Sequence, residues 1–216
     1  MRRPLLIVGA SGFGREALDV VEAHNAARPL GAFEVLGVLD DAPSEINLAR
    51  LAARSIRYLG AVDDYIPDHD PMDYILAIGR PRVREYLVKR FDEGGWHAVA
   101  VVHPSATLGS MVSIADGVVV CAGAQVSTNV RLERHVHVNP NATVGHDSVL
   151  SSYVSINPSA IVSGEVSVGP RTLIGAGAIV LQGLSIGADT TVGAGAVVTK
   201  SVPNGVVVKG VPGVWS

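Results

Sequence analysis

A histidine followed directly by an aspartate is the residue pair in this sequence best suited to acid–base chemistry. His146 and Asp147 end the segment 139–147, which reads Asn-Pro-Asn-Ala-Thr-Val-Gly-His-Asp. An imidazole held by a carboxylate can act as an oriented general base, and the carboxylate stabilises the imidazolium that forms. We therefore predict His146 as a general base and Asp147 as its partner. A surface pair on a turn, without a catalytic role, is the alternative.

A glycine-rich turn near the N-terminus is the second candidate site. The apolar run 5–8 leads into residues 9–14, which read Gly-Ala-Ser-Gly-Phe-Gly, and a helical pattern follows. Glycines placed after a buried strand let backbone N–H groups approach a phosphate. Asp40 lies further along the chain, at the end of the next predicted strand. There its carboxylate could accept a hydrogen bond from a ribose or sugar hydroxyl.

The spacing of these glycines, G-x-x-G-x-G, differs from the G-x-G-x-x-G of many NAD enzymes. The pattern also contains only one mononucleotide-binding half. We therefore expect a single nucleotide-linked ligand rather than NAD. A tight strand–helix turn that binds no ligand is the alternative.

Two further sets of residues could do chemistry. The imidazoles of His135, His137 and His146 could ligate zinc, but His135 and His137 alternate within one stretch and other elements of a ligand pattern are missing. We therefore expect no metal site. Cys121 could carry an acyl group, but it lies next to an inward-facing aliphatic position and is expected to be structural.

The composition divides the chain near residue 102. Residues 1–101 hold about 27 of the 37 charged side chains and eight of the ten aromatic ones. Apolar runs at 5–8, 33–39, 74–78 and 98–102 alternate with helical patterns at 14–26 and 82–91. This alternation predicts a parallel sheet with helices, a Rossmann-like half of a doubly wound fold. We expect one domain over residues 1–101 and another over 102–216.

A six-residue period runs through the second domain without a gap. One aliphatic residue in six suits a short strand and a tight turn, and three such units close one coil. Successive coils then stack about 4.8 Å apart. This hexapeptide pattern predicts a parallel β-helix with small residues and glycines at its corners, where positive φ is needed. The periodic positions are Leu108, Ile114, Val120, Val126, Leu132, Val138, Val144, Leu150, Ile156, Val162, Val168, Ile174, Val180, Ile186, Val192 and Val198.

Charge and hydropathy exclude several classes of protein. The net charge of −3 gives no basic face for nucleic acid. No apolar run reaches the roughly 18 residues of a membrane span, and the run at 5–8 is too short for a signal peptide. A single cysteine excludes an internal disulfide. Together these features predict a cytoplasmic protein without a nucleic-acid or membrane partner.

The order of the motifs resembles that of one family. The Gly-Ala-Ser-Gly-x-Gly turn, the Asp40-Asp41 pair, the Ala-Ile-Gly segment 77–79 and a hexapeptide helix carrying Gly-His-Asp at 145–147 follow one another along the chain. This order resembles the acetyltransferases of the sialic-acid O-acetyltransferase type. That family includes acetyltransferases acting on UDP-, dTDP- or GDP-linked 4-amino sugars. The resemblance covers essentially the whole chain.

The resemblance implies a left-handed β-helix that uses acetyl-CoA to acetylate the amine of a nucleotide-linked amino sugar in surface glycan biosynthesis. It also implies a homotrimer, which the flat faces of a β-helix favour because clefts form between neighbouring copies. His146 matches the base and Asp147 its partner, without a metal. By position, the nucleotide-sugar contacts are Gly12, Phe13, Gly14, Asp40, Asp41, Gly79 and Arg80, and the acetyl-CoA positions are Ser155, Gly164, Ala176 and Ala194.

Two positions depart from the pattern of this family. Phe13 stands where histidine is common. Ser155, which follows His146 in the sequence, stands where members often have a second histidine at the thioester. Three alternatives therefore stay open: a sugar O-acetyltransferase of the sialic-acid type, a zinc hydratase, and a nucleotide-sugar binding protein without catalytic activity.

Overall fold

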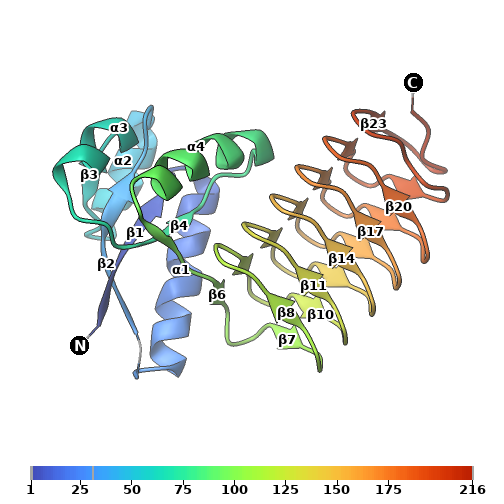
Figure 1. Cartoon of the computed structure of the whole chain (residues 1–216), viewed down its shortest axis with the longest axis horizontal. Helices are drawn as coiled ribbons and strands as arrows, with labels where there is room; N and C mark the ends of the chain where they lie inside the picture. The colour runs from blue at the N-terminus through green and yellow to red at the C-terminus, as the bar shows by residue number, and fades with distance from the viewer. Residues whose placement is uncertain (1, 31, 216) are drawn as a thin grey trace. The chain divides into compact units, whose positions relative to one another are not determined.

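The chain divides into two compact units, residues 1–101 and 102–216. The computed structural model describes residues 2–30 and 32–215 (Figure 1). Within these ranges, none of the helices combines the length and the apolar character that crossing a bilayer requires.

The first unit alternates strands and helices around one parallel sheet. The strand order is β3-β2-β1-β4-β5 and every neighbouring pair is parallel. The elements are β1 (Arg3–Val8), α1 (Gly12–Ala27), β2 (Phe33–Leu39), α2 (Glu45–Ala52), β3 (Tyr58–Gly60), α3 (Val62–Tyr65), η1 (Ile66–Asp68), β4 (Asp73–Leu76), α4 (Pro81–Glu93) and β5 (His97–Ala98).

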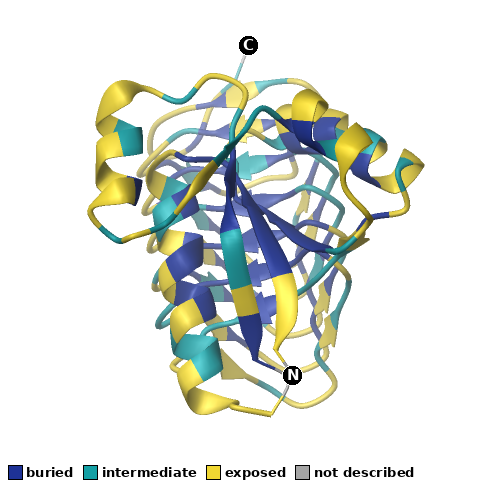
Figure 2. Ribbon diagram, turned by 90° about the vertical axis from the view of Figure 1, so that its left-hand side faces the viewer, coloured by how far each residue is buried: buried dark blue, intermediate teal, exposed yellow. Residues whose placement is uncertain are grey.

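The core of this unit lies on the two faces of β1 and β4. All four residues of β4 are buried, as are the last four of β1, because a parallel sheet with helices on both faces excludes water from both sides (Figure 2). The helix α1 buries one face that includes Ala17, Leu18 and Val21, spaced three and four residues apart. The ring of Phe91 on α4 stacks on Tyr74 of β4 at 4.1 Å.

The prediction of one strand over 98–102 is wrong. Residues 97–98 form β5 and pair with β4, whereas Val101 and Val102 form β6 and join a sheet of the second unit. An apolar run cannot reveal this division, since both sheets bury the same residue types. The short elements between β2 and β4, namely α2, β3, α3 and η1, were also not anticipated.

The second unit is a parallel β-helix with three sheets. In strand order they are β22-β19-β16-β13-β10-β7 (the β13 face), β20-β17-β14-β11-β8 (the β14 face) and β23-β21-β18-β15-β12-β9-β6 (the β15 face). The strands are β6 (Val101–Val102), β7 (Thr107–Leu108), β8 (Ser113–Ile114), β9 (Val119–Val120), β10 (Gln125–Val126), β11 (Arg131–Leu132), β12 (His137–Val138), β13 (Thr143–Val144), β14 (Val149–Leu150), β15 (Ser155–Ile156), β16 (Ile161–Val162), β17 (Ser167–Val168), β18 (Leu173–Ile174), β19 (Ile179–Val180), β20 (Ser185–Ile186), β21 (Thr191–Val192), β22 (Val197–Val198) and β23 (Val207–Val208).

The coils stack with a fixed register along each face. Val126 of β10 pairs with Val144 of β13, which pairs with Val162 of β16. These three aliphatic side chains are buried and form a ladder inside the β-helix. Because the same pairing repeats coil after coil, a residue at any corner lies against the equivalent residue of the next coil.

The glycines that follow the inward aliphatic residues serve a different purpose from the one predicted. A Cβ atom on Gly145 would lie 2.4 Å from the backbone nitrogen of Gly164 in the next coil, and one on Gly175 would lie 2.6 Å from that of Ala194. These glycines permit close approach of the backbones. Positive φ occurs two residues later, where many positions are not glycine: Met111, Asn129, His135, Asn141, Asp147, Tyr153, Ser159, Glu165, Arg171 and Asp189.

The internal ladder predicts where the β-helix is most sensitive to truncation. Ile156 is fully buried, so Ile156→Ala should lower the free energy of unfolding by about 2–5 kcal/mol, the range for buried large-to-small changes. The exposed Thr191, on the same face, provides the control: Thr191→Ala should cost about 0.5 kcal/mol or less. Denaturant unfolding measures both; equal losses would contradict an internal position for Ile156.

Candidate active site

His146 and Asp147 meet in the turn between β13 and β14. The imidazole Nδ1 of His146 lies 2.7 Å from Oδ2 of Asp147. This contact favours the tautomer with the proton on Nδ1, which leaves Nε2 to accept a proton from a substrate. Both side chains are exposed, as a base that works on a substrate from solution must be.

Asp147 also makes a contact that the sequence analysis missed. The side-chain amide of Asn129, at the same corner one coil earlier, donates a hydrogen bond of 2.6 Å to Oδ1 of Asp147. Both carboxylate oxygens are therefore engaged. The hydrogen bond from Asn129, followed by that from His146, holds the pKa of the Asp147 carboxyl below its usual value. The carboxylate thus stays ionised opposite the imidazole.

Gly164 lies directly beneath the imidazole of His146. A Cβ atom at this position would lie 2.5 Å from Nε2 and 2.6 Å from Cε1 of the ring. Since real Cβ atoms do not approach other atoms so closely, the absence of a side chain at Gly164 is what lets the ring lie over the next coil. Gly164 was predicted as an acetyl-CoA position; the structure places it against the imidazole of His146.

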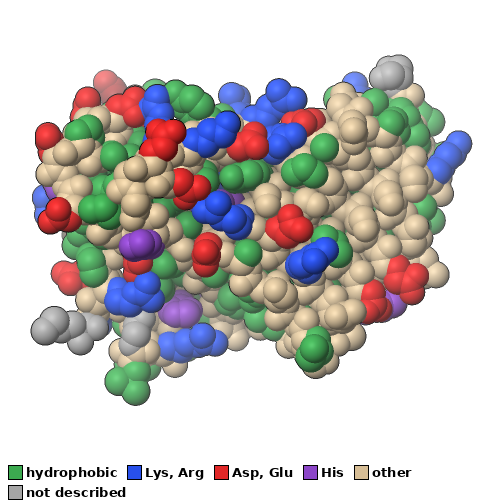
Figure 3. All heavy atoms as spheres, in the orientation of Figure 1, with side chains coloured by type: hydrophobic (Ala, Val, Ile, Leu, Met, Phe, Trp, Pro, Cys, Tyr) green, Lys and Arg blue, Asp and Glu red, His purple; other side chains and the backbone are tan. Residues whose placement is uncertain are grey.

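A groove of about 510 Å³ ends at His146 on the β13 face. Its wall comes from three successive coils and carries mainly small, uncharged side chains. On the visible face of Figure 3, charged side chains are likewise sparse over the β-helix. The lining residues are Thr107, Gly109, Gln125, Val126, Ser127, Thr128, Thr143, Val144, Gly145 and His146.

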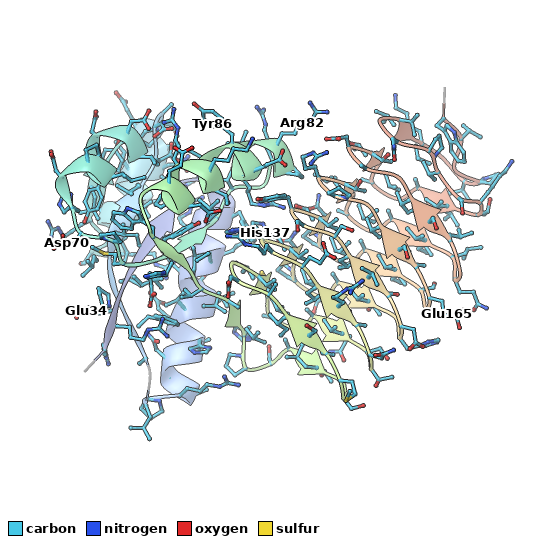
Figure 4. All side chains as sticks on the ribbon, in the orientation of Figure 1. Glu34, Asp70, Arg82, Tyr86, His137 and Glu165 are labelled. Carbon is cyan, nitrogen blue, oxygen red and sulfur yellow. The ribbon has the colours of Figure 1, made fainter. Side chains whose placement is uncertain are left out.

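Glu165 is a second carboxylate at this corner that the sequence analysis missed. One ligand atom from each of His146, Asp147 and Glu165 lies within 4.8 Å of the others. The side chain of Glu165 is exposed and points away from the interior of the β-helix (Figure 4). Its position one coil after Asp147 could have identified it. The cluster has the spacing of a cation site, although hydrogen bonds already occupy both oxygens of Asp147.

The three histidines considered as zinc ligands do not gather. Both His135 and His137 are buried, and the ring of His135 stacks on Tyr153 at 5.6 Å. Among the described residues, neither belongs to a group with metal-ligand spacing. Cys121 is buried as well, consistent with a structural role.

The predicted nucleotide-sugar residues follow the ends of three neighbouring strands. Gly12 and Gly14 follow β1, Asp40 follows β2, and Gly79 follows β4, with β1 between the other two. The connections from β1 and β4 diverge at this point, and ligands of open α/β sheets bind at such a switch point. Gly12 and Gly79 are exposed, and a Cβ atom on either would meet nothing within 4 Å.

The two aspartates of this region hold the backbone. Oδ2 of Asp40 accepts a hydrogen bond of 2.7 Å from the backbone nitrogen of Ala10, which fixes the turn after β1. Oδ1 of Asp41 accepts one of 2.8 Å from the backbone nitrogen of Val62, at the start of α3. These contacts give both aspartates a structural role beside the predicted one. Gly14 is also structural, since its Cβ would lie 1.9 Å from the carbonyl oxygen of Gly9.

The turn that holds Gly79 and Arg80 depends on a residue that the sequence analysis overlooked. Arg84 is fully buried, and its guanidinium donates hydrogen bonds to the carbonyl oxygens of Ile78 at 2.8 Å and Gly79 at 3.2 Å. Its place in an amphipathic helix gave no signal for this role. Arg80 is exposed and precedes α4, whereas Phe13 is half-buried in the first turn of α1.

The predicted acetyl-CoA residues do not all gather in one chain. Ser155 is buried within β15, in a face that does not adjoin the turn of His146. Ala176 and Ala194 are exposed at the corner between the β15 and β13 faces, in successive coils. Only Gly164 lies beside His146.

Comparisons with known proteins match both units. Residues 4–91 match the PglD N-terminal domain, and residues 165–200 match the bacterial transferase hexapeptide (six repeats). No curated protein matches the sequence.

Three solved structures resemble the chain along its whole length. The acetyltransferase domain of PglB from Neisseria gonorrhoeae, in complex with acetyl coenzyme A, is 30% identical, with 100% of each chain covered and a TM-score of 0.88. PerB from Caulobacter crescentus, in complex with CoA and GDP-perosamine, is 28% identical, with 99% of this chain and 97% of that chain covered and a TM-score of 0.86. WeeI from Acinetobacter baumannii is 28% identical, with 98% and 99% covered and a TM-score of 0.83.

These matches confirm the predicted fold class, an α/β Rossmann-like unit followed by a left-handed parallel β-helix of hexapeptide repeats. The chain belongs to the family of acetyl-CoA-dependent N-acetyltransferases of nucleotide-linked amino sugars.

Proposed function

We propose that this protein transfers the acetyl group of acetyl-CoA to the amine of a nucleotide-linked amino sugar, with His146 as the general base. The observation that carries the proposal is the hydrogen bond between His146 and Asp147. It leaves Nε2 of His146 available beside a groove. The family relationship supports the reaction class.

The reaction needs only one proton acceptor on the protein. The amine nitrogen attacks the thioester carbonyl carbon, and Nε2 of His146 takes the proton that the nitrogen must lose. The tetrahedral adduct then collapses, the carbon–sulfur bond breaks, and the CoA thiolate leaves and acquires a proton. Asp147 stabilises the imidazolium formed in between. A general base of this kind contributes about 10²–10⁴-fold to the rate.

The carboxylates around His146 favour an amine over a hydroxyl as the acceptor. Asp147 and Glu165 are both exposed, and an amine in solution is mostly a cationic ammonium, which gives one proton to the solvent before its nitrogen attacks. Two negative charges near the base raise the local concentration of such a cation. They provide no comparable attraction for a neutral hydroxyl.

The corner between the β15 and β13 faces suits the pantetheine chain of acetyl-CoA. Ala176 and Ala194 are exposed there, and Cβ atoms on the adjoining Gly177 and Gly195 would meet nothing within 4 Å. Small residues leave the backbone accessible to an extended chain. Ser155, the other predicted position and one where the family often has a histidine, is buried in the single chain and would have to be uncovered to contact the acetyl group.

We further propose that the protein is a cytoplasmic homotrimer. Ala176 and Ala194 lie at a different corner of the β-helix from His146, so a second copy would complete the site. Ile161 and Leu181 are 39% and 42% exposed, and contact with a neighbouring copy would cover them. The substrate would be held by Gly12, Phe13, Gly14, Asp40, Asp41, Gly79 and Arg80 in the first unit.

Thiol release from acetyl-CoA, measured with a panel of UDP-, dTDP- and GDP-linked 4-amino sugars, tests the proposed reaction. The wild type should release thiol with at least one acceptor, and His146→Ala should lower turnover about 10²–10⁴-fold. Both proteins should elute at the same volume in gel filtration. Thiol release only with sugars that carry a hydroxyl in place of the 4-amino group would assign O-acetylation. Undiminished turnover of His146→Ala would show that His146 is not the base.

The contact between Gly164 and His146 predicts that a single added methyl group displaces the base. Gly164→Ala should lower kcat about 100-fold, because a shift near 1 Å is enough for such a loss. Steady-state kinetics with both substrates measures the effect. Gly205→Ala is the comparison, since its new Cβ would meet nothing within 4 Å, although its positive φ of 74° adds a backbone strain that Gly164 does not carry. Equal kcat values in the two variants would contradict the placement of His146.

The negative charge of Glu165 should strengthen binding of the amino-sugar acceptor. Glu165→Gln should raise KM for the amino sugar about three- to fivefold, the size of an exposed ion pair, and leave KM for acetyl-CoA unchanged. At about 1 M salt the two proteins should converge, because the Debye length falls to about 3 Å. Asp116→Asn, an exposed carboxylate elsewhere on the β-helix, is the control. Loss of wild-type activity on chelation with EDTA would instead assign Glu165 to a metal.

A further inference from the structure

A chain of two short hydrogen bonds connects neighbouring coils at the catalytic turn. The amide of Asn129 donates to Oδ1 of Asp147 over 2.6 Å, and Oδ2 of the same carboxylate contacts Nδ1 of His146 at 2.7 Å. Asn129 and Asp147 occupy the same corner of successive coils, with φ of 57° and 61°. The backbone nitrogen of Asp147 donates to the carbonyl of Thr128, which fixes the distance between the two coils.

We propose that Asn129 is a positioning residue for acetyl transfer, which fixes the carboxylate of Asp147 and through it the imidazole of His146. This inference rests on the proposed role of His146 as the base. With the imidazole as its single partner, an exposed carboxylate could rotate about its side-chain bonds and carry the ring with it. The second hydrogen bond, from a different coil, removes that freedom. The direction of Nε2 is then set by the stacking of the coils.

The electrostatic effect of Asn129 acts in the same sense. Its hydrogen bond is the largest contribution that lowers the pKa of the Asp147 carboxyl. An ionised partner is needed because the imidazole becomes cationic when it takes the proton from the amine.

Met111 provides a matched position for the experiment. It lies at the same corner as Asn129, one coil earlier, with φ of 61°, and is exposed. Glycine adopts positive φ without strain, so Asn129→Gly and Met111→Gly each remove a side chain and leave the backbone unstrained. A larger effect of Asn129→Gly therefore reports the loss of its amide.

Kinetics of the full-length protein give the first readout. Asn129→Gly should lower kcat about tenfold or more, with KM for both substrates changed less than about twofold, because orientation of the base is used in the transition state. Met111→Gly should retain kcat within about twofold. Asn129→Asp should also lose activity, since a second carboxylate would face Oδ1 of Asp147.

A titration of the Asp147 carboxyl carbon by NMR gives a second readout that does not depend on turnover. The pKa of the Asp147 carboxyl should rise in Asn129→Gly relative to the wild type and stay the same in Met111→Gly. Equal kcat in the two glycine variants together with an unchanged titration would overturn the inference. If the wild type released no thiol with any acceptor, the proposed function would fail, and the titration would still show whether Asn129 governs the carboxylate.

Discussion

The fixed register between successive coils is the constraint on which the structure of the site depends. Each strand of the β-helix pairs with the strand one coil later, so side chains at a corner stand in columns along the axis. Asn129, Asp147 and Glu165 belong to one such column. His146 and Gly164 belong to the adjoining column. The ring of His146 fits over Gly164 only because glycine has no side chain. The turn that carries His146 and Asp147 is therefore assembled by the stacking of coils rather than by a long loop.

The backbone conformation at the corners costs free energy in residues other than glycine. Asn129, Asp147 and Glu165 all adopt positive φ, a region in which most residues other than glycine are disfavoured. The same column carries Gly183 two coils from Asp147, where no partner of the dyad is needed. The same conformation recurs at corners away from the site, such as Tyr153 and Asp189, so it belongs to the β-helix as a whole. At this corner it is adopted by Asp147, which contacts the imidazole of His146, and by Glu165, whose carboxylate lies near it.

Much of the fold follows from local pattern. The aliphatic period specified the ladders of the β-helix because one buried face repeats without interruption, and the glycine turn after β1 marked the first parallel strand. The adjacent His146 and Asp147 were identifiable because neighbouring residues on a tight turn can reach each other. Asn129 and Glu165 were missed, since their contacts depend on which corner positions face each other across coils. Arg84 was missed because helical periodicity does not distinguish a buried guanidinium from a solvated one.

The proposed reaction requires that Nε2 of His146 receive the proton of the acceptor amine. A crystal structure of the protein with CoA and the nucleotide-linked amino sugar that supports thiol release would locate that amine. We expect the amine nitrogen about 2.6–3.2 Å from Nε2 of His146, the reach of a general base. We also expect Nδ1 of His146 to remain on Asp147. An amine bound beyond the reach of His146, with another side chain or an ordered water network as its nearest proton acceptor, would show that His146 is not the base.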